Sequence, residues 1–506
     1  MRSDADHNDP IASTQAAREH GRGVVQASAR WHDGLGFWAE VEGENVRIAI
    51  AAQAGDQRLA SLAGERHAAP DVTVVRAAPS GATLRTLREL LPSLTPRPLG
   101  LATSAGFGDR LGLATPGHVD AMRAAGATGV APIFAQQSMR ENARTGRNPQ
   151  EVVDDATWGA FLAGWTGPVG ADADHLKTED DIDLCLAAGY SFFTFDPGAH
   201  VNAEADVMTS ADLELAFQAL PWHDLDTSPA DLKARLAGAS LDAGERLVTF
   251  GPGELERAAV KYGRAVAHVA RMADHLRRAA TYPTEVEVSV DETPTATSLA
   301  EHLYFATELK RLGVEWVSLA PRFVGDFEKG VEYLGDLGLL SSNLIGHAAI
   351  ARQLGPYKLS LHSGSDKFSA YPIAAAAADG LVHLKTAGTS YLEALRVVGA
   401  VQPELLHRIA RLAIQHFAED VKSYHVSGSP AGMPNLGALP GTAIGALLEQ
   451  FDSRQVLHVT FGSALKAHGA ELRAVLQSHP AAYRAALRRH FERHLAPFVV
   501  AKGAPA

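Results

Sequence analysis

The chain has few of the features that mark secreted or membrane proteins. Among 506 residues there is one cysteine, Cys185, so no disulfide can form within the chain. We expect this residue, in DIDLCLAAG, to be a small buried helix residue rather than a nucleophile. The sequence has no run of about 18 apolar residues, the length that a membrane span needs. MRSDADHNDP has no apolar core of a secretory signal, so a cytoplasmic protein is predicted.

Clusters of Lys and Arg are also absent. The formal net charge is −12, and a general nucleic-acid surface needs the opposite sign. With 46% hydrophobic and 21% charged residues, the chain can form a large core and exceeds the size of one simple domain. We therefore expect a soluble protein that binds a small molecule, with neither nucleic acid nor membrane as partner.

Several familiar catalytic motifs are absent from the strand ends and helices where they would act. A GxSxG nucleophile elbow, a HExxH helix and a GxGxxG turn after a strand do not occur there, which disfavours a serine hydrolase, a zincin and a dehydrogenase. The stretch HSGSDK contains Gly and Ser but lacks the spacing of a phosphate-binding P-loop. A kinase is disfavoured for the same reason.

Short apolar runs alternate with helix-like segments over the middle of the chain. Such alternation is typical of parallel strands joined by helical crossovers. The runs number eight: PLGLATS (98–104), GVAPIFAQ (129–136), PVGADAD (168–174), SFFTFDP (191–197), EVEVSVDE (285–292), EWVSLAPRF (315–323), YKLSLHSG (357–364) and GLVHLKTAG (380–388).

This count predicts an α/β fold, an eight-stranded (β/α)8 TIM-like barrel, with a doubly wound sheet as the alternative. We expect residues 1–95 to form an N-terminal cap and 96–400 the catalytic barrel. A helical insertion at about 201–283 follows the fourth strand, and 401–506 form a helical C-terminal extension.

Polar side chains follow the strands where a barrel enzyme carries its chemistry. Alternate residues of a strand face the barrel interior, which places Glu285, Glu287, Ser289 and Asp291 on one face. Histidines on three strand ends are candidate ligands of a divalent metal, with a carboxylate such as Glu328 or Asp291 nearby: His175, His362 and His383. Manganese, zinc, nickel, iron and cobalt are not distinguished by this pattern.

Each of these residues also has a structural explanation. With 22 histidines in the chain, a single imidazole can simply be hydrogen-bonded in the core. Asp174 and Asp291 are placed to cap the helices that follow their strands. Glu328 could pair with Lys329 in its loop. Arg322 and Lys367 could be surface charges, although their position at strand ends favours binding of an anion.

Six blocks of the chain resemble the tagaturonate/fructuronate epimerase family of hexuronate catabolism. The resemblance covers about residues 95–400 and rests on GFGDRLGLATPGH, GADADHLKT, VSVDET, LAPRFVGDFEKGVEYLGDL, YKLSLHSGSDKFSAYP and HLKTAGTSYLEALR. It implies a divalent-metal-dependent isomerase that interconverts D-tagaturonate and D-fructuronate.

These two keto acids differ at C4, which is β to the ketone, so its hydrogen is not acidic enough for simple deprotonation. Retro-aldol cleavage of the C3–C4 bond, followed by re-addition on the other face of the aldehyde, is the expected route; it needs an acid/base group for each face. We assign the roles from strand parity and position. The catalytic candidates are Asp174, Glu287 and Asp291; the metal ligands are His175, Glu328, His362 and His383; the substrate carboxylate is bound by Arg322, Lys367 and Lys385.

Three other functions fit the same pattern. A metal-dependent aldolase acting on a sugar acid or sugar phosphate would release the two fragments. A Schiff-base aldolase would use Lys385 or Lys367 and resist chelation. A non-catalytic sugar-acid sensor would use the helical tail to recruit a partner. Apolar helices in the insertion and in the tail are also compatible with a homo-oligomer.

Overall fold

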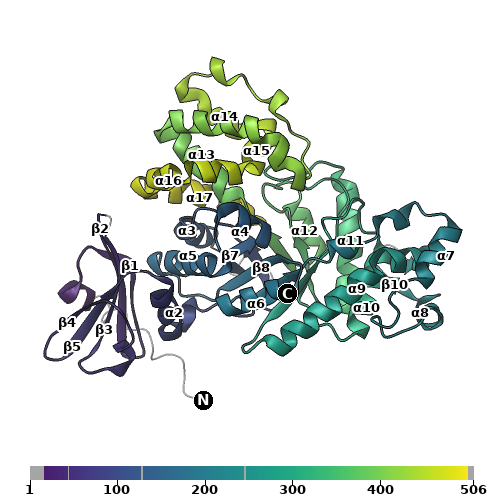
Figure 1. The fold of residues 1–506 in the computed structure, drawn as a ribbon, viewed down its shortest axis with the longest axis horizontal. Coiled ribbons are helices and arrows are strands. Elements are labelled where there is room, and N and C mark those ends of the chain that lie inside the picture. Colours follow the sequence, from purple (N-terminus) through teal and green to yellow (C-terminus); the bar gives the residue numbers. More distant parts are fainter. Residues whose placement is uncertain (1–15, 44, 127–128, 244–246, 500–506) are drawn as a thin grey trace.

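The computed structural model describes residues 16–43, 45–126, 129–243 and 247–499. The segment MRSDADHNDP lies outside these residues. Figure 1 shows a small N-terminal sheet on one side, a central barrel, and a layer of C-terminal helices over the barrel. None of the described helices is both long and apolar enough to cross a membrane.

Eight parallel strands close into a barrel and confirm the predicted fold class. Their order around the barrel is β12-β13-β14-β15-β6-β7-β8-β9. In chain order they are β6 (Thr103–Gly106), β7 (Val130–Ser138), β8 (Gly170–Leu176), β9 (Phe192–Phe195), β12 (Glu285–Ser289), β13 (Ser318–Ala320), β14 (Lys358–Leu361) and β15 (Val382–Lys385). The doubly wound alternative is therefore excluded.

The first strand begins later than the prediction of 98–104. Residues 98–102 form a turn below the barrel, where the Glu285 carboxylate accepts hydrogen bonds from the backbone N–H groups of Leu99 (2.9 Å) and Gly100 (2.8 Å). These two N–H groups therefore bind a side chain and not a neighbouring strand. The apolar run marked a strand correctly but placed it about five residues too early.

Helices surround the barrel: α3 (Thr115–Ala124), α4 (Met139–Thr145), α5 (Pro149–Leu162), α6 (Glu179–Ala188), α9 (Glu254–Ala279), α10 (Leu299–Arg311), α11 (Leu337–Leu354), α12 (Tyr371–Ala377) and α13 (Thr389–Val401). Capping boxes begin several of them; Thr178 with Asp181 starts α6, and Ser298 with Glu301 starts α10. Cys185 is buried on α6 as predicted.

The N-terminal region forms an antiparallel sheet in the order β1-β2-β3-β5-β4. Its strands are β1 (Val24–His32), β2 (Leu35–Glu42), β3 (Asn45–Gln53), β4 (Glu65–Ala68) and β5 (Val72–Ala77), and α2 (Gly81–Leu90) follows them. The buried Arg30 side chain joins the sheet to the barrel by donating to the carbonyls of Phe161 (2.9 Å) and Trp165 (2.8 Å).

The region after β9 is helical, as expected, but also contains a two-stranded antiparallel sheet. It holds α7 (Ser210–Gln218), α8 (Pro229–Leu236), the pair β10 (Ser240–Asp242) and β11 (Leu247–Thr249), and the long α9. The C-terminal region contains α14 (Pro403–Asp420), α15 (Phe451–Val459), α16 (Phe461–Ser478) and α17 (Pro480–Leu495). The division of the chain into three domains at 95 and 400 stays a prediction.

A buried histidine marks the seam between the barrel and the C-terminal helices. His118 on α3 stacks on Phe107, with ring centroids 4.9 Å apart, and meets the edge of Phe491 on α17. Its Nε2 lies 2.8 Å from the Ser390 hydroxyl on α13. Burial lowers the pKa of His118 to about 4, so its neutral form belongs to the folded state.

Acidification should weaken this seam. Because the folded pKa of His118 lies below its unfolded value, its contribution to stability is present above about pH 6.5 and is lost as the pH falls toward 4. A shift of this size is worth about 3 kcal/mol. The free energy of unfolding, measured in urea between pH 7.5 and 4.5, should fall less steeply in His118→Phe than in the unchanged chain. Equal slopes would contradict this role for His118.

Candidate active site

The interior of the barrel is polar at the carboxyl ends of its strands. Glu285, Glu287 and Ser289 of β12 all face inward, as strand parity predicted, and Glu287 is wholly enclosed. Asp172 and Asp174 of β8, which only β9 separates from β12, face the same interior. Carboxylates enclosed in this way need compensating charge or hydrogen bonds.

Lys385 of β15 supplies that charge. Its ammonium nitrogen lies 2.7 Å from Asp174 Oδ1, 2.8 Å from Glu287 Oε1 and 2.9 Å from Asp172 Oδ2. It also donates to the Thr194 hydroxyl at 2.7 Å. These three carboxylates raise the pKa of Lys385 against the opposing effect of burial, so the ammonium stays charged. One buried cation thus holds together strands β8, β12 and β15.

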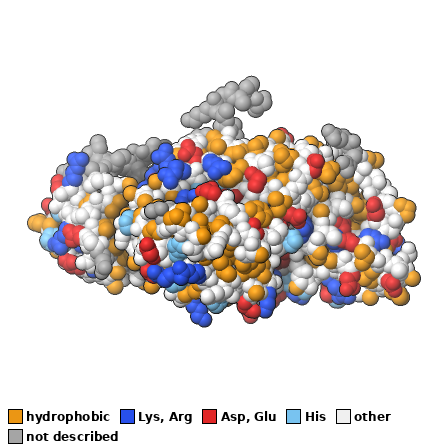
Figure 2. Space-filling view, turned by 90° about the horizontal axis from the view of Figure 1, so that it is seen from above, with side chains coloured by type: hydrophobic (Ala, Val, Ile, Leu, Met, Phe, Trp, Pro, Cys, Tyr) orange, Lys and Arg blue, Asp and Glu red, His pale blue; other side chains and the backbone are white. Residues whose placement is uncertain are grey.

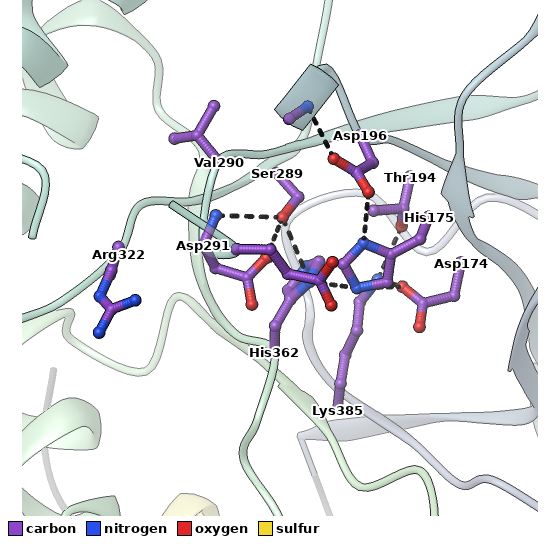
Figure 3. A network of polar contacts seen from close by, with 12 residues as sticks. Asp174, His175, Thr194, Asp196, Ser289, Val290, Asp291, Arg322, His362 and Lys385 are labelled. Carbon is purple, nitrogen blue, oxygen red and sulfur yellow. Dashed lines mark hydrogen bonds and ion pairs between the residues drawn. The ribbon is translucent and has the colours of Figure 1, made fainter. Parts of the chain in front are cut away.

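His362, just after β14, lies between two carboxylates. Its Nε2 is 2.5 Å from Glu287 Oε1, and its Nδ1 is 3.3 Å from Asp291 Oδ1. The same Nδ1 is 3.3 Å from His175 Nε2, and the two imidazole rings are perpendicular, with centroids 5.0 Å apart. Figure 3 shows both residues in one network with Asp291 and Lys385. Burial would raise the pKa of Glu287, but Lys385 and His362 hold it well below its usual range.

His175 reaches this position through an unusual backbone. Its φ of 54° is left-handed, and the pairing of β8 with β9 shifts register between Ala173 and Leu176. The ring Nδ1 lies 3.2 Å from Asp196 Oδ2, and Nε2 lies 3.8 Å from Asp174 Oδ1. Burial opposes a charged ring, but these carboxylates outweigh it and raise the pKa of His175 to about 10.

These side chains form a group that could hold a metal ion. The ligand atoms of Asp174, His175 and His362 all lie within 4.8 Å of one another, and His175 belongs to a second such group with Asp196 and Glu292. Two imidazoles beside carboxylates suit zinc and the neighbouring divalent metals. The two best-placed histidines of the predicted ligand set are therefore brought together, with Asp174 beside them.

The other two predicted ligands are not in this group. Glu328 Oε2 accepts hydrogen bonds from the Ser427 backbone N–H (2.9 Å) and from Gln455 Nε2 (2.7 Å), so it joins its loop to the C-terminal region. His383 lies one layer deeper in the barrel, with Nδ1 2.9 Å from the Ser104 hydroxyl. The structure therefore does not bring these two side chains to the other predicted ligands, because position at a strand end does not reveal depth or loop direction.

The predicted substrate-binding cations also separate. The Lys367 ammonium is buried and donates to the carbonyls of Glu328 (2.7 Å), Val331 (2.5 Å) and Ser365 (2.9 Å), so it braces two loops and is not available to a substrate. Lys385 is occupied by carboxylates of the protein. Of the three, only Arg322 lines a cavity, and Figure 3 shows it standing apart from the histidines, beyond Asp291.

Asp366, in the same HSGSDKF stretch, ties this loop to the C-terminal helices. Its carboxylate lies 2.7 Å from His490 Nε2 and 3.1 Å from an Arg454 nitrogen, and its backbone N–H donates to His494 Nε2 at 3.0 Å. The φ of Asp366 is 61°. Together with Lys367, it holds the loop that follows His362.

A cavity of about 400 Å³ opens above His362. Asp291, Ser360 and His362 form its inner end; Arg322 and Lys329 contribute from the loop after β13; and the C-terminal region adds residues 422–425. Sequence reasoning missed Lys329 as a site residue and assigned no chemistry to 422–425. It also missed Asp172, which strand parity with Asp174 in GADADH could have identified.

A closed (β/α)8 barrel with such groups at the carboxyl ends of its strands is the architecture of a barrel enzyme whose site takes a small polar substrate. Residues 40–498 match the tagaturonate epimerase family, and the chain belongs to this family. Its members are carbohydrate epimerases, which are isomerases.

Two relatives illustrate the similarity. The chain is 39% identical to the tagaturonate/fructuronate epimerase of Thermotoga maritima over 479 residues, which cover 94% of this chain and 97% of that protein. The native crystal structure of the fructuronate-tagaturonate epimerase from Cohnella laeviribosi is 31% identical and superposes with a TM-score of 0.88 over 97% of this chain and 99% of that one.

Removal of the central cation should destabilise the barrel. Lys385→Met leaves three buried carboxylates without their partner, which should lower the free energy of unfolding by about 3–5 kcal/mol in metal-free protein. Urea unfolding in the presence of EDTA measures this loss. The matched variant Lys466→Met, at an exposed position on α16, should change stability by only about 0.5 kcal/mol. A similar small change in Lys385→Met would refute its role.

Proposed function

We propose that this protein interconverts D-tagaturonate and D-fructuronate by inverting C4, and that the reaction depends on a divalent metal. The observation that supports this most directly is a buried group of Asp174, His175 and His362 in a chain that aligns along almost its whole length with an epimerase of this type. The proposed location is the cytoplasm, which fits a chain with one buried, unpaired cysteine.

The residues present fit a metal by the chemistry of their donors. Asp174, His175 and His362 would hold it, and Asp196 and Glu287 orient the two imidazoles through hydrogen bonds to their ring nitrogens. A divalent metal supplies Lewis acidity toward the ketone and its neighbouring hydroxyl.

Asp291 is the residue best placed to move the proton of the C4 hydroxyl. It lines the cavity, whereas Glu287 is enclosed beneath His362 and Lys385. His362 and His175 lower the pKa of Asp291 despite its burial, so it enters the reaction as a carboxylate. Asp291 takes the proton as the C3–C4 bond breaks and an aldehyde forms. After rotation of the aldehyde and re-formation of the C3–C4 bond on its other face, the proton that Asp291 took returns to the C4 oxygen by way of solvent, so the protein ends the cycle as it began. Lys385 and His175 lower the pKa of Asp174 despite its burial, so Asp174 holds no proton to donate and would serve as a metal ligand.

The activity can be tested by proton NMR of D-fructuronate with purified protein. D-tagaturonate should appear, its formation should stop with EDTA, and it should resume when a divalent metal is restored. Absence of conversion with every metal tried would refute the epimerase proposal, and accumulation of separate cleavage fragments would indicate an aldolase instead.

The proton-transfer role predicts the effect of Asp291→Asn. The substitution keeps the shape of the side chain but removes its basicity, so kcat should fall by about 10²–10⁴-fold. Asp180→Asn, at an exposed position on α6, is the matched control and should leave kcat unchanged.

The bond-breaking route has its own signature. In D2O, the product should carry no deuterium at C4, because the C4 hydrogen is never removed. Wild-type kcat in Asp291→Asn, or deuterium at C4, would contradict the retro-aldol mechanism with Asp291 as base.

A further inference from the structure

The cavity above His362 has two chemically different ends. Its inner end carries Asp291 and His362 beside the candidate metal group. Its outer end carries the basic side chains Arg322, Lys329, Lys422 and His425 together with the carboxylates of Glu292 and Asp326. A ligand that fills it would therefore place metal-binding oxygens inside and an anionic group outside.

Three of the outer cations already have partners in the protein. Arg322 donates to the Thr293 carbonyl and lies 3.4 Å from Asp326 Oδ1. His425 Nε2 is 3.6 Å from the same oxygen, and the largely exposed Lys422 lies 2.5 Å from Glu419 Oε2. Their charges are thus partly balanced before any ligand arrives.

Lys329 differs from these three. Its side chain is half-buried at the cavity wall, and within the described part of the chain its ammonium makes no ion pair or hydrogen bond. Glu328, the neighbour that sequence reasoning offered as a partner, is occupied by Ser427 and Gln455. A half-buried ammonium without a partner gains more from an incoming anion than one already paired.

The backbone on both sides of Lys329 is fixed. The Glu328 carbonyl accepts from Lys367 Nζ at 2.7 Å, and the Gly330 carbonyl accepts from Arg454 Nε at 2.6 Å. With the Glu328 carboxylate also held, the loop has little freedom at this point, so binding of a ligand by Lys329 costs little ordering of the chain.

The opposite wall of the cavity, residues 422–425, is also held in place by side-chain contacts. Arg140 donates to the Ser423 carbonyl (3.2 Å), and Arg144 donates to the Ser423 hydroxyl (2.8 Å). Both guanidinium groups lie over the Tyr424 ring, at 5.2 and 4.9 Å from its centroid. Helix α4 therefore holds residues 422–425 in place across the cavity from the loop after β13.

From this geometry we propose that Lys329 binds the carboxylate of the substrate and so selects ketohexuronates over neutral ketohexoses. The proposal rests on the proposed function, since a ketohexuronate carries its ketone and its carboxylate at opposite ends. Lys329 is a specificity-determining residue in this account, and the C-terminal region completes the cavity in which it acts.

The test compares KM for D-fructuronate with the inhibition constant of D-fructose, which lacks the carboxylate, in metal-loaded full-length protein. Lys329→Gln should raise KM for D-fructuronate about 10- to 100-fold with little change in kcat, and it should leave the inhibition constant of D-fructose within about twofold. Lys329→Arg should recover most of the affinity. Lys466→Gln, an exposed position on α16 with the same charge change, should behave as the unchanged chain.

Two further measurements test the proposal: the dependence of KM on ionic strength, and inhibition by a sugar phosphate. Raising salt should raise KM in the unchanged chain but have much less effect in Lys329→Gln.

An unchanged KM in Lys329→Gln, or an equal loss of affinity for D-fructuronate and D-fructose, would overturn the proposal while leaving the epimerase function intact. D-fructose 6-phosphate tests for a phosphate ligand. An inhibition constant of D-fructose 6-phosphate below the KM for D-fructuronate, with this inhibition lost in Lys329→Gln, would instead assign Lys329 to a phosphate. Failure of the unchanged chain to convert D-fructuronate would count against the proposed function itself.

Discussion

The site depends on compensation of negative charge inside the barrel. Asp172, Asp174 and Glu287 converge from two strands, and the Lys385 ammonium lies within 2.9 Å of an oxygen of each. Without that cation, the carboxylates would repel one another or become protonated. With it, Glu287 stays ionised and orients His362. The acidic interior is thus stable in the folded chain, and it positions the imidazoles above it.

Charge is distributed differently away from the interior. Acidic and basic side chains are interspersed over the face in Figure 2. The cavity carries Asp291 and His362 at its inner end, whereas its outer end combines Arg322, Lys329 and Lys422 with the carboxylates of Glu292 and Asp326. The loop after β14 connects the site to the rest of the structure. His362 lies at its start, and Asp366 and Lys367 bind it to the C-terminal helices and to the loop after β13. In the stretch HSGSDK, the imidazole of His362 therefore belongs to the site, while the carboxylate of Asp366 and the ammonium of Lys367 hold the loop.

The sequence predicted the barrel well, because strand and crossover patterns are local. It also led to the expectation that His175, His362 and Asp174 lie close together, which the structure shows, since strand ends of a closed barrel converge. It did not place side chains whose position depends on the path of a loop or on their depth inside the barrel. Glu328 and Lys367 follow strands yet point toward protein partners, and His383 lies below the site. Lys329 became informative only once its neighbour Glu328 was seen to pair with the C-terminal region, a contact about a hundred residues away in sequence.

The most direct test of this account is the metal content of the purified chain after equilibrium dialysis against a divalent metal. We predict one tightly bound ion per chain, its loss in His362→Gln, and its retention in His490→Gln. The second variant alters the other buried carboxylate–histidine group, formed by Asp366, His490 and His494. Retention of the ion in His362→Gln, or its loss only in His490→Gln, would contradict the assignment of the catalytic site to the mouth of the barrel.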